Sequence, residues 1–170
     1  VLAARPQVAG LLGGGKDAPA APAKAESIWD AAKLGDLDFI SKDLSQDGDV
    51  DAREPLKRST PLIIAALYGQ KEAARLLIEK GANVKATNND GDTALHSAAF
   101  FCHAEIVRLL LAKGADALAK NKRGDTPLSA VTMPWNATIE GIYRLVAGAL
   151  QIDLDMERIK RVRPKIVTLL

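Results

Sequence analysis

The chain has 170 residues, of which 48% are hydrophobic and 4% aromatic, and its formal net charge at pH 7 is +2. Basic and acidic residues are mixed, so the charge gives no indication of a nucleic-acid partner, and no segment approaches the roughly 18 consecutive apolar residues that a membrane span needs. The single cysteine allows no intramolecular disulfide and leaves the redox compartment undetermined.

Residues 1–26 differ in composition from the rest of the chain. They contain a glycine run at 13–15 and an alanine- and proline-rich run at 18–23. Such a segment cannot build a packed core, so we predict an extended arm or linker that is able to wrap a neighbouring protein. The first residue is Val1 rather than methionine, which fits a removed targeting leader and a linker from an upstream domain equally well. Both an exported or organelle-targeted location and a cytoplasmic one therefore stay open.

Two short phrases recur at a fixed spacing in the rest of the chain. Thr-Pro-Leu at 60–62 returns at 126–128, and as Thr-Ala-Leu at 93–95, with a step of 33 residues. Lys-Gly-Ala at 80–82 returns at 113–115 with the same step of 33. A constant period of this length indicates one structural unit stacked several times.

Each unit has the pattern of two short helices followed by a turn. After Thr93, apolar residues follow helical spacing in two segments that are separated near Cys102. Thr60 and Thr93 are favoured residues before the first turn of a helix, and Gly81 follows a second helix, where glycine takes a left-handed conformation without steric cost. The turn residues at 88–91 predict a projecting β-turn or hairpin.

The two ends of the array are predicted to be atypical, because terminal units must face water. The fourth unit opens normally, has an enlarged turn around Pro134, and is expected to resume its second helix near Ile142. The predicted units span 27–54, 55–87, 88–120 and 121–154, with a partial capping helix pair at 155–170.

Residues 27–170 resemble the ankyrin-repeat family through the Thr-Pro-Leu-His opening, the Ala-Ala pair and the Gly-Ala-Asp close of each unit. The resemblance implies an all-α solenoid of about four helix–turn–helix units with projecting turns or hairpins. It also implies that the ring of His96 bridges backbone groups of adjacent turns, and that His103 belongs to the start of a second helix. The sequence departs from the family pattern at Ile63, Ala94 and Cys102, which predicts lower local rigidity.

Catalysis and metal binding find little support. His96, Cys102 and His103 lie close in sequence and include zinc-ligand types, but both histidines match recurrent positions of the repeat. No phosphate-binding loop or serine nucleophile motif is present, and the aspartates fall in turns. We expect neither catalytic residues nor a metal or cofactor. Cys102 stands where the previous unit has Gly69, so we predict a left-handed backbone and a partly exposed thiol, open to oxidation or to a partner contact.

Two surfaces are candidates for partner binding. The resemblance implies recognition through the concave face, where the residues after each Ala-Ala pair lie, and through the turn tips. Trp135 has an alternative role, which is to fold inward and fill the enlarged turn. The predicted apolar stripe on the concave face is Leu67, Tyr68, Phe100, Phe101, Met133 and Trp135. The predicted contacts at the turn tips are Lys57, Arg58, Asn89, Asp90, Asp92, Lys122, Arg123 and Asp125.

Basic side chains cluster in two further places, and we interpret both clusters as solvated faces. They are Lys120, Lys122 and Arg123 in one cluster and Arg158, Lys160, Arg161 and Arg163 in the other. Taken together, the sequence favours a non-catalytic adaptor or scaffold subunit that binds protein. A regulatory or targeting domain of a longer enzyme is the alternative, and an effector that acts on the proteins of a host fits the same pattern.

Overall fold

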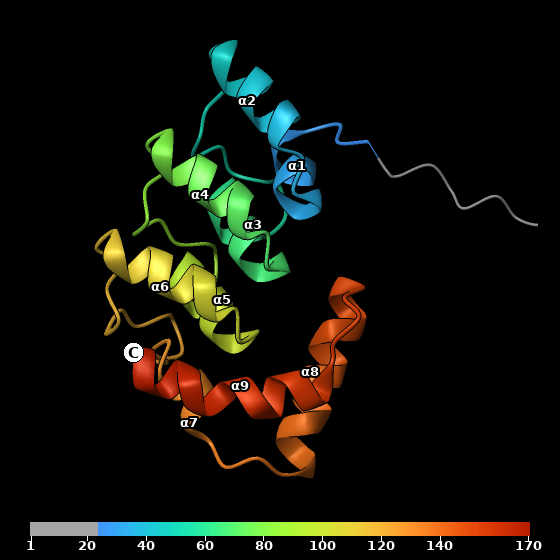
Figure 1. Cartoon of the computed structure of the whole chain (residues 1–170), viewed down its shortest axis with the longest axis vertical. Helices are drawn as coiled ribbons and strands as arrows, with labels where there is room; N and C mark the ends of the chain where they lie inside the picture. Colours follow the sequence, from blue (N-terminus) through green and yellow to red (C-terminus); the bar gives the residue numbers. More distant parts are fainter. Residues whose placement is uncertain (1–23) are drawn as a thin grey trace, which may run out of the picture.

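The computed structural model describes residues 24–170, and within this range every regular element is an α-helix (Figure 1). The single β pairing in this range is an isolated antiparallel bridge between Thr87 and Thr93. The predicted arm at 1–26 falls almost wholly outside the described residues. The helices are α1 (Ile28–Leu34), α2 (Leu37–Ser45), α3 (Pro61–Tyr68), α4 (Lys71–Glu79), α5 (Ala94–Phe100), α6 (Ala104–Ala112), α7 (Ser129–Thr132), α8 (Ala137–Leu150) and α9 (Met156–Leu169).

The helices form a two-layered solenoid, as the repeat predicts. The inner helices α1, α3, α5 and α7 stack in chain order, and the outer helices α2, α4 and α6 stack behind them (Figure 1). Small side chains allow the inner helices to approach closely, since the alanine pairs 65–66 and 98–99 are fully buried. Larger residues such as Leu77 and Leu110 fill the layer between neighbouring units.

The predicted helix boundaries follow from the expected capping residues. The side chains of Thr60 and Thr93 accept hydrogen bonds from the backbone N–H groups of Ile63 and His96. Pro61 occupies the first turn of α3, where its missing N–H costs nothing. Gly69 ends the same helix in a left-handed conformation with φ of 76°. These caps set both ends of α3 and the start of α5 from local sequence, whereas α4 and α6 begin without a side-chain cap.

The last part of the chain differs from the prediction. The inner helix α7 has only four residues, and the expected capping helix pair is a single helix, α9. Pro164 lies inside α9 without breaking it, because its fixed φ is helical and the buried side chains of Ile159 and Ile166 hold the helix on both sides of it.

The prediction for the second helix of the fourth unit is also wrong. α9, rather than α8, packs against α6 and α7, and so takes the outer position next to α6. The helix that resumes after the enlarged turn, α8, is an insertion between the inner and outer helices and stands to one side of the array (Figure 1). The limits of the individual units stay a prediction.

Candidate functional site

Three members of the predicted apolar stripe, Phe100, Phe101 and Trp135, come together around Tyr143 of α8. The rings of Phe100 and Phe101 meet edge to face with centroids 4.9 Å apart, and Tyr143 of α8 stacks on Phe100 at 4.6 Å. Trp135 also stacks with Tyr143, with ring centroids 5.6 Å apart. Phe101 is only 3% exposed. The aromatic residues therefore form a stacked cluster around Tyr143, which is 1% exposed, rather than an open row.

α8 supplies a ring partner for Phe100 that the repeat pattern does not contain. Trp135 stacks on Tyr143 and is partly exposed. Tyr68 stays partly exposed, and Met133 is 50% exposed. Leu67 is also partly exposed. Within the predicted stripe, Phe101 is buried, and Phe100 and Trp135 are partly exposed beside Tyr143.

The sequence analysis did not identify Tyr143, which attaches α8 to the end of α5. Its hydroxyl donates to the carbonyl of Phe100 over 2.8 Å. At the other end of α8, the hydroxyl of Tyr68 donates to the carbonyl of Leu150 over 3.2 Å. The spacing of Ile139, Tyr143 and Ala147, all buried, marks one face of a helix and could have indicated the contact.

Two of the arginines interpreted as solvated are bound to the protein instead. Arg158 donates to the carbonyls of Phe101 and Cys102, both over 3.2 Å. Arg163 donates to the hydroxyl of Tyr143 over 2.9 Å and to the carbonyl of Met133 over 2.7 Å. The forked guanidinium can bond several carbonyls at once, so these two side chains fasten α9 onto the turns that precede α6 and α8.

The backbone prediction for Cys102 is confirmed, and the prediction of its exposure is wrong. Its φ is 57°, in the left-handed region, and its side chain is buried within the hydrophobic core. Burial raises the pKa of the thiol to about 11, so the reactive thiolate is disfavoured at neutral pH. This cysteine is a packed residue rather than an accessible redox group.

The two histidines connect neighbouring units, as the repeat implies for His96. Thr93 donates its backbone N–H to Nδ1 of His96 over 3.1 Å, and Nε2 lies 3.1 Å from the carbonyl of Asp125 in the next turn. Nε2 of His103 lies 3.2 Å from the carbonyl of Leu67, and burial lowers the pKa of His103 to about 4. A Cβ atom at Gly69 would lie 2.6 Å from the His103 ring, so glycine makes this contact possible.

The turn tips form a regular row joined by backbone hydrogen bonds. Asn89 donates its N–H to the carbonyl of Lys57 over 2.8 Å, and Lys122 does the same to Asp90 over 2.9 Å. The side chain of Asn88 shapes one tip by accepting from the N–H groups of Asp90 and Asp92. One ion pair joins two tips, with Nζ of Lys57 3.2 Å from Oδ2 of Asp90. The row is rigid at its backbone and presents charged side chains to solvent.

The predicted tip residues divide into exposed and structural members. Arg58, Asn89, Lys122 and Arg123 are exposed. Asp92 accepts a hydrogen bond from the Asn121 side chain over 2.7 Å, and the carbonyl of Asp125 lies 3.1 Å from the ring of His96. Asp92 and Asp125 thus contribute to the stacking of the turns as well as to the surface.

Two further classes of site have no candidate in the described part of the chain. No helix of the segment 24–170 combines the length and apolar character needed to cross a bilayer. In the same segment, no three or more His, Cys, Asp or Glu side chains gather in a way that could hold a metal ion.

Comparisons with known proteins agree with the repeat. A family model described as ankyrin repeats, in three copies, matches residues 28–121. The chain is 43% identical over 65 residues to the potassium channel KOR1 of Oryza sativa subsp. japonica, a match that covers 38% of this chain and 8% of the channel. It is 30% identical over 71 residues to the phosphocholine transferase AnkX of Legionella pneumophila, which covers 42% of this chain and 8% of that enzyme. The aligned part of the chain therefore spans a small fraction of both relatives.

Proposed function

Since the chain belongs to the ankyrin-repeat family, we propose that it is a non-catalytic protein-interaction module, an adaptor or scaffold subunit that binds its partner through the turn tips and the concave face. The observation that carries this proposal is the row of tips from Lys57 to Arg123. Their backbones are fixed by bonds that repeat from one tip to the next, while most of their side chains are exposed to solvent. A surface that is ordered before binding loses little conformational entropy when a partner docks.

On the concave face, the accessible ends of the predicted stripe are the proposed apolar contacts. Tyr68 lies at one end, beside the carboxyl end of α8, and Met133 lies at the other. The inserted α8 adds two exposed apolar side chains of its own, Ile142 and Leu145. Phe101 and Trp135 support the fold, so their loss is expected to act on stability before it acts on binding.

A second candidate function is a regulatory or targeting domain within a longer protein. It is favoured by the small share, 8%, of each curated relative that the chain matches. The two relatives are a potassium channel and a phosphocholine transferase, so neither is composed of repeats alone. The intact mass of the protein from its native source, together with its full transcript, distinguishes a free adaptor from a domain of a larger chain.

The test of the proposal begins with crosslinking and mass spectrometry in the native source, which identifies the partner. The affinity of that partner is then measured with Lys57→Ala and Arg123→Ala at the tips and with Tyr68→Ala on the concave face. The tip changes are expected to slow association and to reduce its salt dependence. Tyr68→Ala is expected to reduce the binding free energy by about 2 kcal/mol, the effect of removing an anchor residue.

Matched controls separate surface charge in general from the tips in particular. Lys80→Ala and Lys113→Ala remove exposed lysines at the ends of α4 and α6, and they should leave the affinity unchanged. Removal of residues 1–26 tests whether the N-terminal segment is a second attachment element. If the tip and Tyr68 changes have no more effect than the controls in a folded protein, binding through these surfaces is contradicted.

A further inference from the structure

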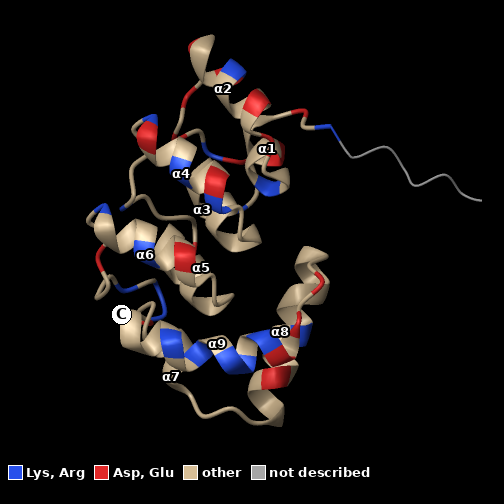
Figure 2. Cartoon of the chain, viewed as in Figure 1, with Lys and Arg blue, Asp and Glu red and all other residues tan. Residues whose placement is uncertain are grey.

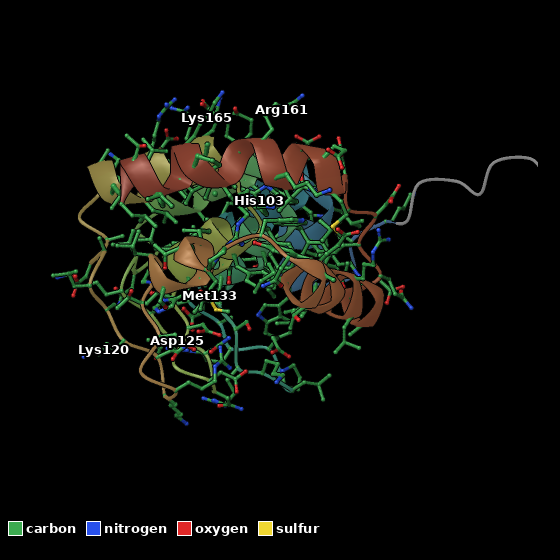
Figure 3. All side chains as sticks on the ribbon, turned by 90° about the horizontal axis from the view of Figure 1, so that it is seen from below. His103, Lys120, Asp125, Met133, Arg161 and Lys165 are labelled. Carbon is green, nitrogen blue, oxygen red and sulfur yellow. The ribbon has the colours of Figure 1, made fainter. Side chains whose placement is uncertain are left out.

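An open pocket lies at the end of the array, between α7, the enlarged turn and α9. Apolar walls come from Met133, Trp135, Pro164 and Val167, among others, and two cationic side chains, Lys160 and Arg163, also line the pocket. Met133 is 50% exposed and Val167 is 39% exposed. Figure 3 looks onto this end of the molecule and shows Met133 below α9. Apolar side chains are thus left uncovered at the end of the stack, where a terminal unit is expected to be polar.

The pocket also contains a buried positive charge that no carboxylate neutralises within residues 24–170. Arg163 is only 5% exposed, and its hydrogen-bond partners in this range are the carbonyls of Ala130 and Met133 and the hydroxyl of Tyr143. The guanidinium carbon of Arg163 lies 5.6 Å from the centre of the Trp135 ring, and Nζ of Lys160 lies 5.4 Å from the same centre. A buried charge without a counter-ion is costly and creates a strong local potential.

The surroundings of the pocket strengthen this positive potential. α9 carries five basic side chains and one acidic side chain, and the basic ones appear as blue bands along the helix in Figure 2. Lys160 is paired with Glu157 and Glu140. Arg161 and Lys165 are exposed and point from the side of α9 that is opposite Met133 in Figure 3. They add to the net positive charge of α9 without lining the pocket, whose own cationic side chains are Lys160 and Arg163.

The charge pattern decides between the possible occupants. A second copy stacked end to end would bring two identical basic helices together, which is unfavourable. The N-terminal segment is attached at the opposite end of the array, next to α1 (Figure 1). Its sequence over 1–23 has the basic residues Arg5 and Lys16 against the single acidic residue Asp17, so it lacks the complementary charge. An acidic partner fits the pocket better than either.

Resting on the proposed function as a protein-interaction module, we propose that this end pocket is a separate docking site for an acidic protein segment that carries an apolar side chain. The apolar side chain packs against Met133, Trp135 and Val167. Carboxylates on either side of it are attracted by the positive field of α9. The site would recognise a short segment, in contrast to the extended contact proposed for the turn tips.

The experiment uses a fluorescein-labelled peptide, Glu-Glu-Leu-Leu-Glu-Glu, titrated with the whole chain at low ionic strength and followed by fluorescence anisotropy. Saturable binding is expected, and it should weaken by about tenfold when serine replaces both leucines or when glutamine replaces the glutamates. The emission of Trp135, isolated in a Trp29→Phe chain, should change on titration with the unlabelled peptide. An absence of saturable binding, or equal binding of the serine or glutamine peptide, overturns the proposal.

Matched substitutions locate the binding. Val167→Asp is expected to lower the affinity for the peptide by about tenfold. Leu37→Asp, at a residue of α2 that is 38% exposed, should leave this affinity unchanged. The pair Arg161→Gln and Lys165→Gln should weaken binding at low salt more than the pair Lys80→Gln and Lys113→Gln. Each variant is first checked by its thermal melt. Equal effects of the pocket and control changes would contradict the end pocket.

Two further measurements separate the end pocket from a general polyanion site and from the turn tips. A single-stranded oligonucleotide that displaces the peptide with equal affinity would show a general polyanion site and overturn the proposal. Lys57→Ala, at a turn tip, should leave peptide binding unchanged. If the chain binds its crosslinked partner through the tips but does not bind the peptide, the end-pocket proposal is contradicted. The proposed function as a protein-interaction module then stands.

Discussion

The hydroxyl of Tyr143 donates a hydrogen bond of 2.8 Å to the carbonyl of Phe100, and the two rings stack with centroids 4.6 Å apart. The two residues are 43 positions apart in the sequence. Their contact attaches α8 to the end of α5, at a place where the repeat would otherwise leave aromatic side chains uncovered. The same hydroxyl accepts a hydrogen bond from Arg163 of α9, so one side chain joins three helices.

Tyr143→Phe should therefore lower the free energy of unfolding by about 1–3 kcal/mol, because it leaves the Phe100 carbonyl and an N–H group of Arg163 without their partner. The ring stacking is retained, so the loss measures the hydrogen bonds. Urea unfolding gives the value. Tyr68→Phe, which removes a longer bond at a partly exposed position, should cost less. Equal and negligible losses for both variants would show that the buried network contributes little.

The stabilities of glycine and alanine variants at Cys102 are expected to show the cost of its left-handed backbone. Cys102→Gly removes the penalty of a left-handed residue, about 1 kcal/mol, which offsets the loss of the buried thiol and the added unfolded-state entropy. Cys102→Ala loses the sulfur and keeps the penalty, so it should be the less stable variant. Thermal or urea unfolding of the three proteins checks the order. A glycine variant more than about 1 kcal/mol below the wild type would contradict a dominant role for the strain.

The stability of the fold should fall in mild acid because of His103. Its folded-state pKa of about 4 lies below the ordinary value of 6.5, so between these values the unfolded chain binds a proton that the folded chain excludes. The contribution of neutral His103 to the free energy of unfolding is complete above about pH 6.5 and is lost as the pH falls toward 4. The loss is roughly 1.4 kcal/mol per pH unit.

The matched comparison for this prediction is His103→Gln, whose amide can still donate to the carbonyl of Leu67 but does not titrate. Urea unfolding at a series of pH values gives both stability profiles. The difference between them isolates His103 from the carboxylates, which titrate in both proteins. Parallel profiles for the two proteins between pH 6.5 and 4 would show that His103 is not responsible.

Deletion of residues 155–170 should lower the stability by several kcal/mol or cause aggregation. α9 buries Ile159 and Ile166, and the deletion exposes the apolar faces of α6 and α7 against which it packs. Ile166→Ala is a milder version, with an expected cost of about 2–5 kcal/mol. The measurements are a thermal melt and size-exclusion chromatography. A soluble protein with an unchanged cooperative melt after the deletion would refute the capping role of α9.

The sequence by itself determined the repeated part of this protein. The period, the threonine caps and the closing glycines predicted the helices up to α6, and the comparison of Cys102 with Gly69 predicted a left-handed residue. These features depend on groups within a few positions of one another, such as the bond from Ile63 to Thr60. Stacked units also contact their neighbours at a constant spacing, so the period of the sequence predicts which residues of adjacent units meet.

The tertiary structure alone decided the role of everything after the enlarged turn. α8 and α9 are both amphipathic helices of 14 residues, and periodicity shows that each has an apolar face without showing which surface it covers. That choice rests on contacts outside the repeat period, from Tyr143 to Phe100 and from Arg158 to Cys102. The same contacts placed Phe100 of the predicted stripe against Tyr143 and buried the thiol of Cys102. Whether a surface residue is buried depends on which distant segment packs over it, and the residues of the surface do not specify that segment.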